Sequence, residues 1–179
     1  MQQEIRHKMT VKNLNTNEYG SYYQPYIDIC GNMELLEGLE YNLIETCEFL
    51  KSIPSGKYEY SYDKGKWTIK ELVQHLIDTE RIFTYRALRF ARNDSTELPG
   101  YDENKYVPQS KAYHREFTDL IEEFNIVRKS TVSLFKSFND EMLMRSGKAN
   151  NYEMSARAMA FIITGHCKHH CKVIKERYL

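Results

Sequence analysis

Residues 155–174 read SARAMAFIITGHCKHHCKVI, and this stretch decides the fold. Its apolar side chains recur every three or four residues, the spacing at which one face of a helix is buried. Ser155 stands directly before the run as a candidate N-cap. The pattern therefore predicts a long amphipathic helix that continues almost to the C-terminus and needs partners for its apolar face.

Three further segments have the same periodicity, and no segment has the alternating pattern of a strand. The segments expected to be helical are residues 32–51, 69–92 and 111–138. Thr68 and Glu71 form a capping box before the second of these, and Ser110 is a candidate N-cap for the third. Four amphipathic helices bury their apolar stripes against one another, so we expect an all-α four-helix bundle.

The connections between these segments are expected to be irregular. Residues 93–109 contain two prolines and are longer than a tight helix hairpin needs, which fits a crossover. Residues 139–154 form a second connection. Residues 1–31 are rich in Tyr, Asn and Gln and have no steady period, so we expect a loosely ordered lead-in or short helical pieces before a single domain.

The composition limits the classes of function. The chain of 179 residues is 41% apolar, and Lys plus Arg and Asp plus Glu both total 25. This balance gives no positive field for nucleic acid or anionic lipid, so we expect neither as a partner. The longest stretch without a charged residue is residues 158–167, far short of the roughly 20 residues that span a bilayer. Residues 1–10 lack a signal-peptide pattern, so we expect a cytoplasmic protein whose four cysteines are thiols.

Two histidines lie at the centre of the apolar face of the predicted C-terminal helix. At about 100° per residue, His166 and His170 are about 40° apart, with Met159 and Val173 close beside them. A buried imidazole needs a partner for each ring nitrogen, and one divalent metal ion would serve both rings. Two core histidines hydrogen-bonded to carboxylates are the alternative. For a centred pair we favour the metal.

A catalytic divalent metal usually takes three protein ligands, so the third ligand must come from another helix. His75 lies about seven residues into the second predicted helix, and antiparallel packing would bring it level with His170. A histidine paired with Asp78 is an equal alternative for this position. Cys167 and Cys171 lie too far round their helix to share one ion with the histidines, so we expect them to pack between helices.

Several motifs resemble the DinB/YfiT-like superfamily. They are KWTIKEL at residues 66–72, HLID at 75–78, RALRFAR at 86–92, LPGYDE at 98–103 and GHCKHH at 165–170. The family pattern is a Trp-led capping box, a His-Leu-x-Asp on the second helix and a His-x-x-His-His near the C-terminus. The resemblance covers residues 32–179, which we expect to form the bundle domain, and leaves residues 1–31 as the lead-in.

This resemblance implies a four-helix bundle of up-down-down-up order with a long crossover between helices two and three. It maps the family's three metal-binding histidines onto His75, His166 and His170, with zinc or nickel as the metal, and it implies a homodimer. Some members are thiol S-transferases that use a low-molecular-weight thiol such as bacillithiol or mycothiol, and related folds isomerise maleylpyruvate. The resemblance therefore implies a small-molecule substrate, while no motif specifies catalytic residues.

Two functions of different classes fit these observations. The first is a metal-dependent enzyme, a transferase or a hydrolase, whose ion lowers the pKa of a bound water or thiol. The second is a non-catalytic stress-response or interaction module whose ion ties two helices together. An open coordination position facing a cleft would favour the enzyme, and a fourth protein ligand would favour the module. Arg86 and Arg89 could bind an anionic co-substrate, although ion pairs with Asp or Glu are their favoured role.

Overall fold

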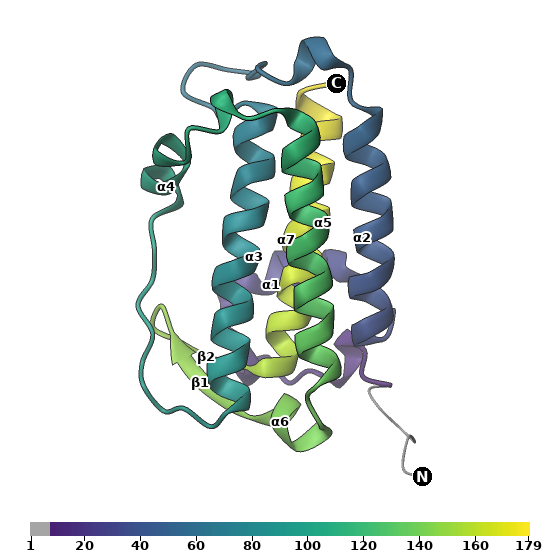
Figure 1. Ribbon diagram of the computed structural model, residues 1–179. Coiled ribbons are helices and arrows are strands. Elements are labelled where there is room, and N and C mark those ends of the chain that lie inside the picture. Colours follow the sequence, from purple (N-terminus) through teal and green to yellow (C-terminus); the bar gives the residue numbers. More distant parts are fainter. Residues whose placement is uncertain (1–7) are drawn as a thin grey trace.

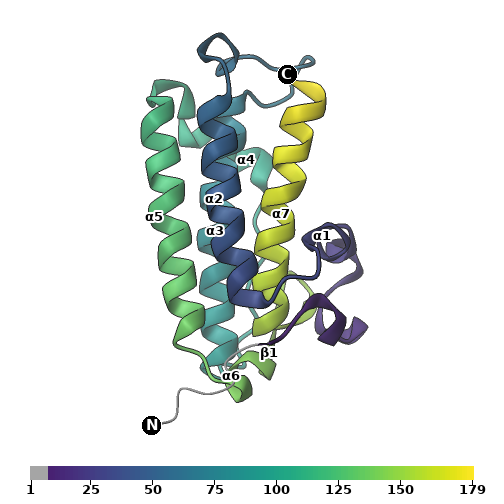
Figure 2. The same cartoon turned by 90° about the vertical axis from the view of Figure 1, so that its right-hand side faces the viewer.

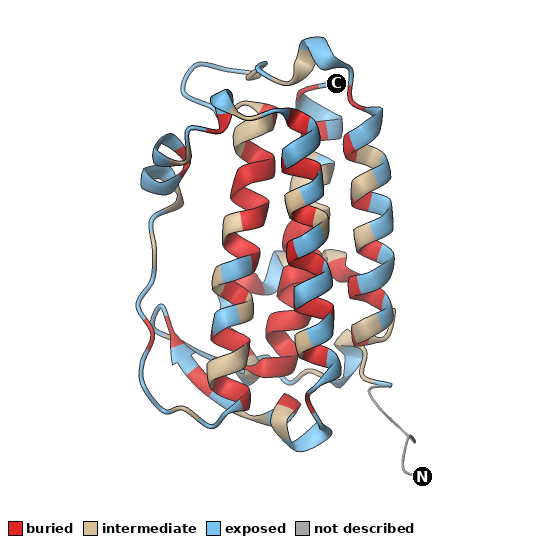
Figure 3. Ribbon diagram, in the orientation of Figure 1, coloured by how far each residue is buried: buried red, intermediate tan, exposed pale blue. Residues whose placement is uncertain are grey.

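The amphipathic segments fold into four long helices close to their expected bounds, in a computed structural model that describes residues 8–179. These helices are α2 (Leu35–Ser52), α3 (Ile69–Ala91), α5 (Phe117–Lys136) and α7 (Ala156–Arg177). They pack side by side as a bundle (Figure 1), and their inward faces carry the buried residues (Figure 3). The prediction of an all-α four-helix bundle is confirmed.

The helices follow an order in which α2 and α7 run upward in Figure 1 while α3 and α5 run downward. Both α2 and α3 contact α5 and α7, so each helix has two neighbours in the ring. As a result α3 and α7 are antiparallel neighbours, whereas α3 and α5 are parallel. The segment that joins α3 to α5 returns along the outside of the bundle and carries the short helix α4 (Glu103–Ser110) (Figure 1).

The third predicted helix begins later than expected. The sequence predicts a start after Ser110, but α4 ends at that residue and α5 begins only at Phe117. The hydroxyl of Ser110 donates to the carbonyl oxygen of Val107 within α4, and the residue at the N-cap position of α5 is Glu116. Lys111 then has a φ of 51°, a left-handed conformation that interrupts helical winding, and the short 3-10 helix η5 (Ala112–His114) follows.

The connection at residues 139–154, expected to be irregular, contains regular structure. Residues 139–154 include the short helix α6 (Asp140–Met144) and most of a two-stranded antiparallel hairpin, in which β1 (Ser146–Ala149) pairs with β2 (Tyr152–Ser155). The turn residues Asn150 and Asn151 have φ values of 51° and 67°. Asparagine tolerates positive φ, and two such residues in succession match the twist of a tight hairpin. The four-residue strands are too short to produce a visible alternating pattern.

The predicted lead-in, residues 1–31, forms short helical pieces where it is described, and residues 1–7 lie outside the described residues. Its elements are η1 (Val11–Asn13), η2 (Thr16–Glu18), η3 (Ser21–Tyr23) and α1 (Gln24–Cys30). Helix α1 packs against α7 on one side of the bundle (Figure 2). A Cβ atom on Gly165 of α7 would lie 1.9 Å from the carbonyl oxygen of Tyr26, so glycine permits this close approach.

A buried ion pair ties three helices together inside the bundle. The guanidinium of Arg128 on α5 donates to both carboxylate oxygens of Glu80 on α3, at 2.7 and 2.9 Å. It also donates to the side-chain oxygen of Asn42 on α2, at 2.7 Å. A buried charge of this kind is stable only when its hydrogen bonds are satisfied, as they are here. None of the helices in the described residues is long and apolar enough to span a membrane.

We predict that Gly165→Ala destabilises the protein by about 1–3 kcal/mol, because the new methyl group would force α1 away from α7. The free energy of unfolding in urea measures this effect. Gly56→Ala is the matched control, since a Cβ atom there has no neighbour within 4 Å. Equal stability of the two variants would show that α1 does not depend on the close approach.

Candidate metal centre

The start of each of two helices determines where its histidines lie. On α3 the capping box forms as expected: the amide of Glu71 donates to the Thr68 hydroxyl, and the Thr68 amide donates to the Glu71 carboxylate. On α7 the Ser155 hydroxyl accepts from the amide of Ala158, so the predicted N-cap is also present. With both starts defined, the antiparallel packing of α3 and α7 brings His75 level with the histidines of α7.

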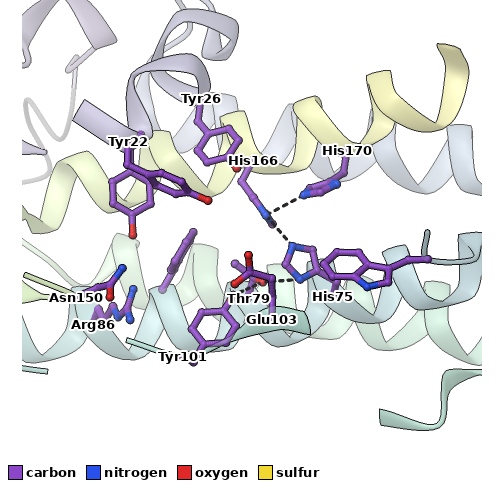
Figure 4. Close-up of a pocket in the computed structure, with 13 residues that line it drawn as sticks. Tyr22, Tyr26, His75, Thr79, Arg86, Tyr101, Glu103, Asn150, His166 and His170 are labelled. Atoms are coloured by element: carbon purple, nitrogen blue, oxygen red, sulfur yellow. Dashed lines mark hydrogen bonds between the residues drawn. The ribbon is translucent and has the colours of Figure 1, made fainter. Parts of the chain in front are cut away.

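The structure brings His75, His166 and His170 together (Figure 4). The Nε2 atom of His166 lies 3.1 Å from Nε2 of His75 and 3.1 Å from Nε2 of His170. One potential ligand atom from each of the three rings lies within 4.8 Å of the others. A neutral imidazole nitrogen carries either one proton or one lone pair, so the Nε2 atom of His166 can satisfy only one of its two neighbours by hydrogen bonding.

These three rings have the chemistry of a divalent metal site. Two imidazole nitrogens bound to one tetrahedral zinc ion at about 2.0–2.1 Å lie roughly 3.3 Å apart, close to the spacing found here. Among the described residues, the group contains no fourth His, Cys, Asp or Glu. The residues present therefore fit a site with three protein ligands.

Burial keeps the three imidazoles neutral, as metal ligands must be. It lowers the pKa of His75 to about 4. Burial also lowers the pKa of His166 and of His170 well below the usual value, and the neighbouring histidines add to both shifts. All three rings can therefore offer a lone pair near neutral pH without first losing a proton to solvent.

A hydroxyl pair supports the ring of His75. The Thr79 hydroxyl lies 3.4 Å from Nδ1 of His75 and 2.6 Å from the Tyr101 hydroxyl (Figure 4). Contacts of this kind orient a ring so that its other nitrogen faces the metal. Asp78, the expected alternative partner of His75, instead accepts from the side-chain amide of Gln74. The Nδ1 atom of His170 is buried and has no hydrogen-bond partner among the described residues.

The three histidines line a cavity of about 170 Å³. Its walls are mostly aromatic and come from α3, α7, the lead-in, the segments before α3 and α4, the first residue of α4 and the turn between β1 and β2. The lining residues that sequence reasoning did not select as candidates are Tyr22, Tyr23, Tyr26, Trp67, Thr79, Phe83, Tyr101, Glu103, Asn150. The tyrosine-rich composition of the lead-in was the available signal for three of them, because aromatic side chains in a polar segment need a surface to pack on.

The other candidates lie away from this group. Cys167 faces α2, where its sulfur is 3.2 Å from the Thr46 hydroxyl, and Cys171 lies 3.9 Å from the same hydroxyl. All four cysteines are free thiols. Arg89 forms the expected ion pair, with Asp94. Arg86 forms no ion pair with another described residue, and it lines the cavity.

The family model of the DinB superfamily matches residues 39–174, which is more than half of the chain. The chain belongs to the DinB superfamily. Among solved structures, YfiT from Bacillus subtilis is similar, with a TM-score of 0.69 and 16% identity over 79% of this chain and 82% of that one. YfiT is described as a probable metal-dependent hydrolase with an unusual four-helix bundle topology; at this identity the likeness shows a common fold. No curated protein matches the chain.

We predict that the metal-free protein loses stability as the pH falls from about 6.5 to about 4. The unfolded His75 binds a proton near pH 6.5 and the folded one near pH 4, so in this window the unfolded state binds more protons and acid favours it. Above pH 6.5, His75 does not change how the free energy of unfolding depends on pH. Urea unfolding at several pH values measures the loss, and His75→Gln should make the decline shallower. If the free energy of unfolding of that variant falls as steeply with pH as that of the wild-type protein, burial of His75 does not cause the loss.

Proposed function

We propose that this DinB superfamily member is a metal-dependent hydrolase in which His75, His166 and His170 hold one divalent ion, with zinc or nickel as the expected metal. The observation that carries the proposal is the convergence of three neutral imidazoles on a cavity. Imidazole nitrogens suit both metals. The description of YfiT as a metal-dependent hydrolase adds support from a protein of the same fold.

The arrangement favours an enzyme over a purely structural metal site. Structural zinc sites are closed by four protein ligands, whereas catalytic sites have three and keep one position for water or substrate. Here three histidines form the whole group among the described residues, and all three line the cavity. A non-catalytic metal-binding module would not need a metal ion that faces a cavity, so we rank it second.

The chain's own residues have separate tasks in this proposal. A divalent ion held by the histidines supplies a Lewis acid that lowers the pKa of a coordinated water or thiol and polarises a substrate carbonyl. Thr79 keeps the ring of His75 oriented. Glu103 places a carboxylate on the cavity wall, where it can accept a proton from the attacking nucleophile. The aromatic walls limit the entry of bulk water.

Thiol transfer is the second candidate chemistry. A site with three neutral ligands leaves the ion its full charge, and a thiol with a free pKa of about 8.5 ionises more readily there than water does. The family resemblance to S-transferases that use low-molecular-weight thiols favours the same candidate. Water and thiol would meet the same ion in the same cavity, so an assay must separate them.

The cytoplasmic location and the homodimer are also proposals. Four free thiols suit a reducing compartment. Size measurement by light scattering would decide the oligomeric state.

We predict about one divalent transition-metal ion per chain in protein purified without a metal-binding tag. His166→Ala or His170→Ala should abolish binding because each breaks the histidine pair on α7, and His75→Ala should weaken binding at least tenfold because that pair remains. Metal analysis by mass spectrometry gives the stoichiometry. Cys167→Ala and Cys171→Ala are the controls on α7 and should bind normally, since both sulfurs lie by Thr46. Full occupancy in a variant with both α7 histidines changed would reject the site.

We predict that a panel of small activated esters and amides includes substrates whose hydrolysis requires metal and stops with chelator or His170→Ala. The same preparation is assayed in parallel with low-molecular-weight thiols and an electrophilic acceptor. Metal-dependent S-conjugation without hydrolysis would replace the hydrolase by the transferase. A bound ion with no turnover on either panel would favour the non-catalytic module.

A further inference from the structure

Three arginine side chains in the described part of the chain are almost fully buried, and only two of them are paired with a carboxylate. Arg128 is 0% exposed and pairs with Glu80, and Arg157 is 5% exposed and pairs with Glu18. Arg86 is 3% exposed and forms no ion pair with any described residue. The fold thus compensates two buried guanidinium charges internally and leaves the third for another partner.

Within the described residues, the contacts of Arg86 are with neutral groups. Its Nη2 atom donates to the carbonyl oxygen of Pro99 at 3.0 Å, and its guanidinium lies near the Tyr23 hydroxyl. The guanidinium carbon lies 5.7 Å from the ring centre of Phe83. These contacts orient the side chain, but a buried charge without an opposite charge is unfavourable. Arg86 also lines the cavity, so a ligand that enters it can supply that charge.

Arg86 and the candidate metal centre lie on one face of α3. At about 1.5 Å and 100° per residue, Arg86 is about 16 Å further along the helix than His75 and only about 20° round it. Thr79 and Phe83 lie between them, and all four residues line the cavity. In Figure 4 Arg86 and Asn150 lie at the opposite end of the view from His75 and His170. The cavity is therefore polarised along α3, with a fixed cation at one end and three neutral imidazoles at the other.

We propose that Arg86 binds the carboxylate of a small monoanionic substrate and so directs the substrate's reacting group toward His75, His166 and His170. A planar guanidinium matches a carboxylate with two parallel hydrogen bonds. A monoanion fits better than a doubly charged phosphate, because Glu103 is the other charged residue among the described lining residues and it is negative. This assignment of a substrate class rests on the proposed function, but carboxylate binding by Arg86 can be measured without any metal.

The test uses butyrate and its uncharged isostere butyramide as probes of the full chain, with and without chelator, at constant ionic strength. Isothermal titration calorimetry and the shift in melting temperature report binding. We expect wild-type protein to bind butyrate at least tenfold more tightly than butyramide, also without metal. Arg86→Gln should remove this preference, and Arg86→Lys should retain part of it, because the charge remains without the planar fork. Arg89→Gln is the matched control on the same helix, since Arg89 pairs with Asp94.

Equal binding of butyrate and butyramide by wild-type protein would overturn the proposal. This comparison does not depend on the folding of any variant. Tighter binding of inorganic phosphate than of butyrate would also overturn it, as would an unchanged preference in folded Arg86→Gln. The outcomes separate this inference from the proposed function. Butyrate binding that depends on Arg86, with no ester or amide hydrolysis, would reject the hydrolase alone. Hydrolysis of neutral esters with no preference for butyrate would reject the role of Arg86 alone.

Discussion

The antiparallel contact between α3 and α7 is the constraint on which the candidate site depends. His75 lies in the first third of α3, whereas His166 lies at the middle of α7 and His170 in its second half, so opposite helix directions bring the three rings to one level. That direction follows from the up-down-down-up order (Figure 1), in which the chain must return along the bundle between α3 and α5. The returning segment brings Tyr101 and Glu103 to the cavity, so one topological feature supplies both the ligand set and part of the wall.

Some buried polar groups of this protein have all their contacts within the protein, and others have only part of them. Arg128 is satisfied on three sides by Glu80, Asn42 and the carbonyl oxygen of Leu39, and it joins α5 to α3 and α2. The histidine cluster and Arg86 are satisfied only in part by their protein neighbours. A buried polar group without a full set of hydrogen-bond or charge partners destabilises a protein. Proteins retain such groups mainly where a ligand completes the contacts. The histidine cluster and Arg86 line the same cavity.

The lead-in turns an open bundle face into a cavity wall. Helix α1 crosses α7 where Gly165 lets the backbones approach, directly before His166 (Figure 2). Tyr22, Tyr23 and Tyr26 then line the cavity with aromatic rings, and of the three Tyr26 packs against the histidines of α7. The Tyr26 ring lies edge-on to the His166 ring, with centres 5.3 Å apart. The lead-in, predicted only as a separate stretch, therefore contributes to the shape of the candidate site.

The amino-acid sequence by itself determined the features that depend on neighbours within one helix. Periodicity located four helices, the capping residues Thr68 and Ser155 marked two starts, and residue spacing placed His166 and His170 on one buried face. Contacts between distant segments decided the rest: the late start of α5, the hairpin at residues 146–155, the packing of α1 and the unpaired state of Arg86. The physical reason is that a local pattern specifies which face of a helix is apolar, whereas the partner of each buried polar group depends on chain segments that meet only in the folded protein.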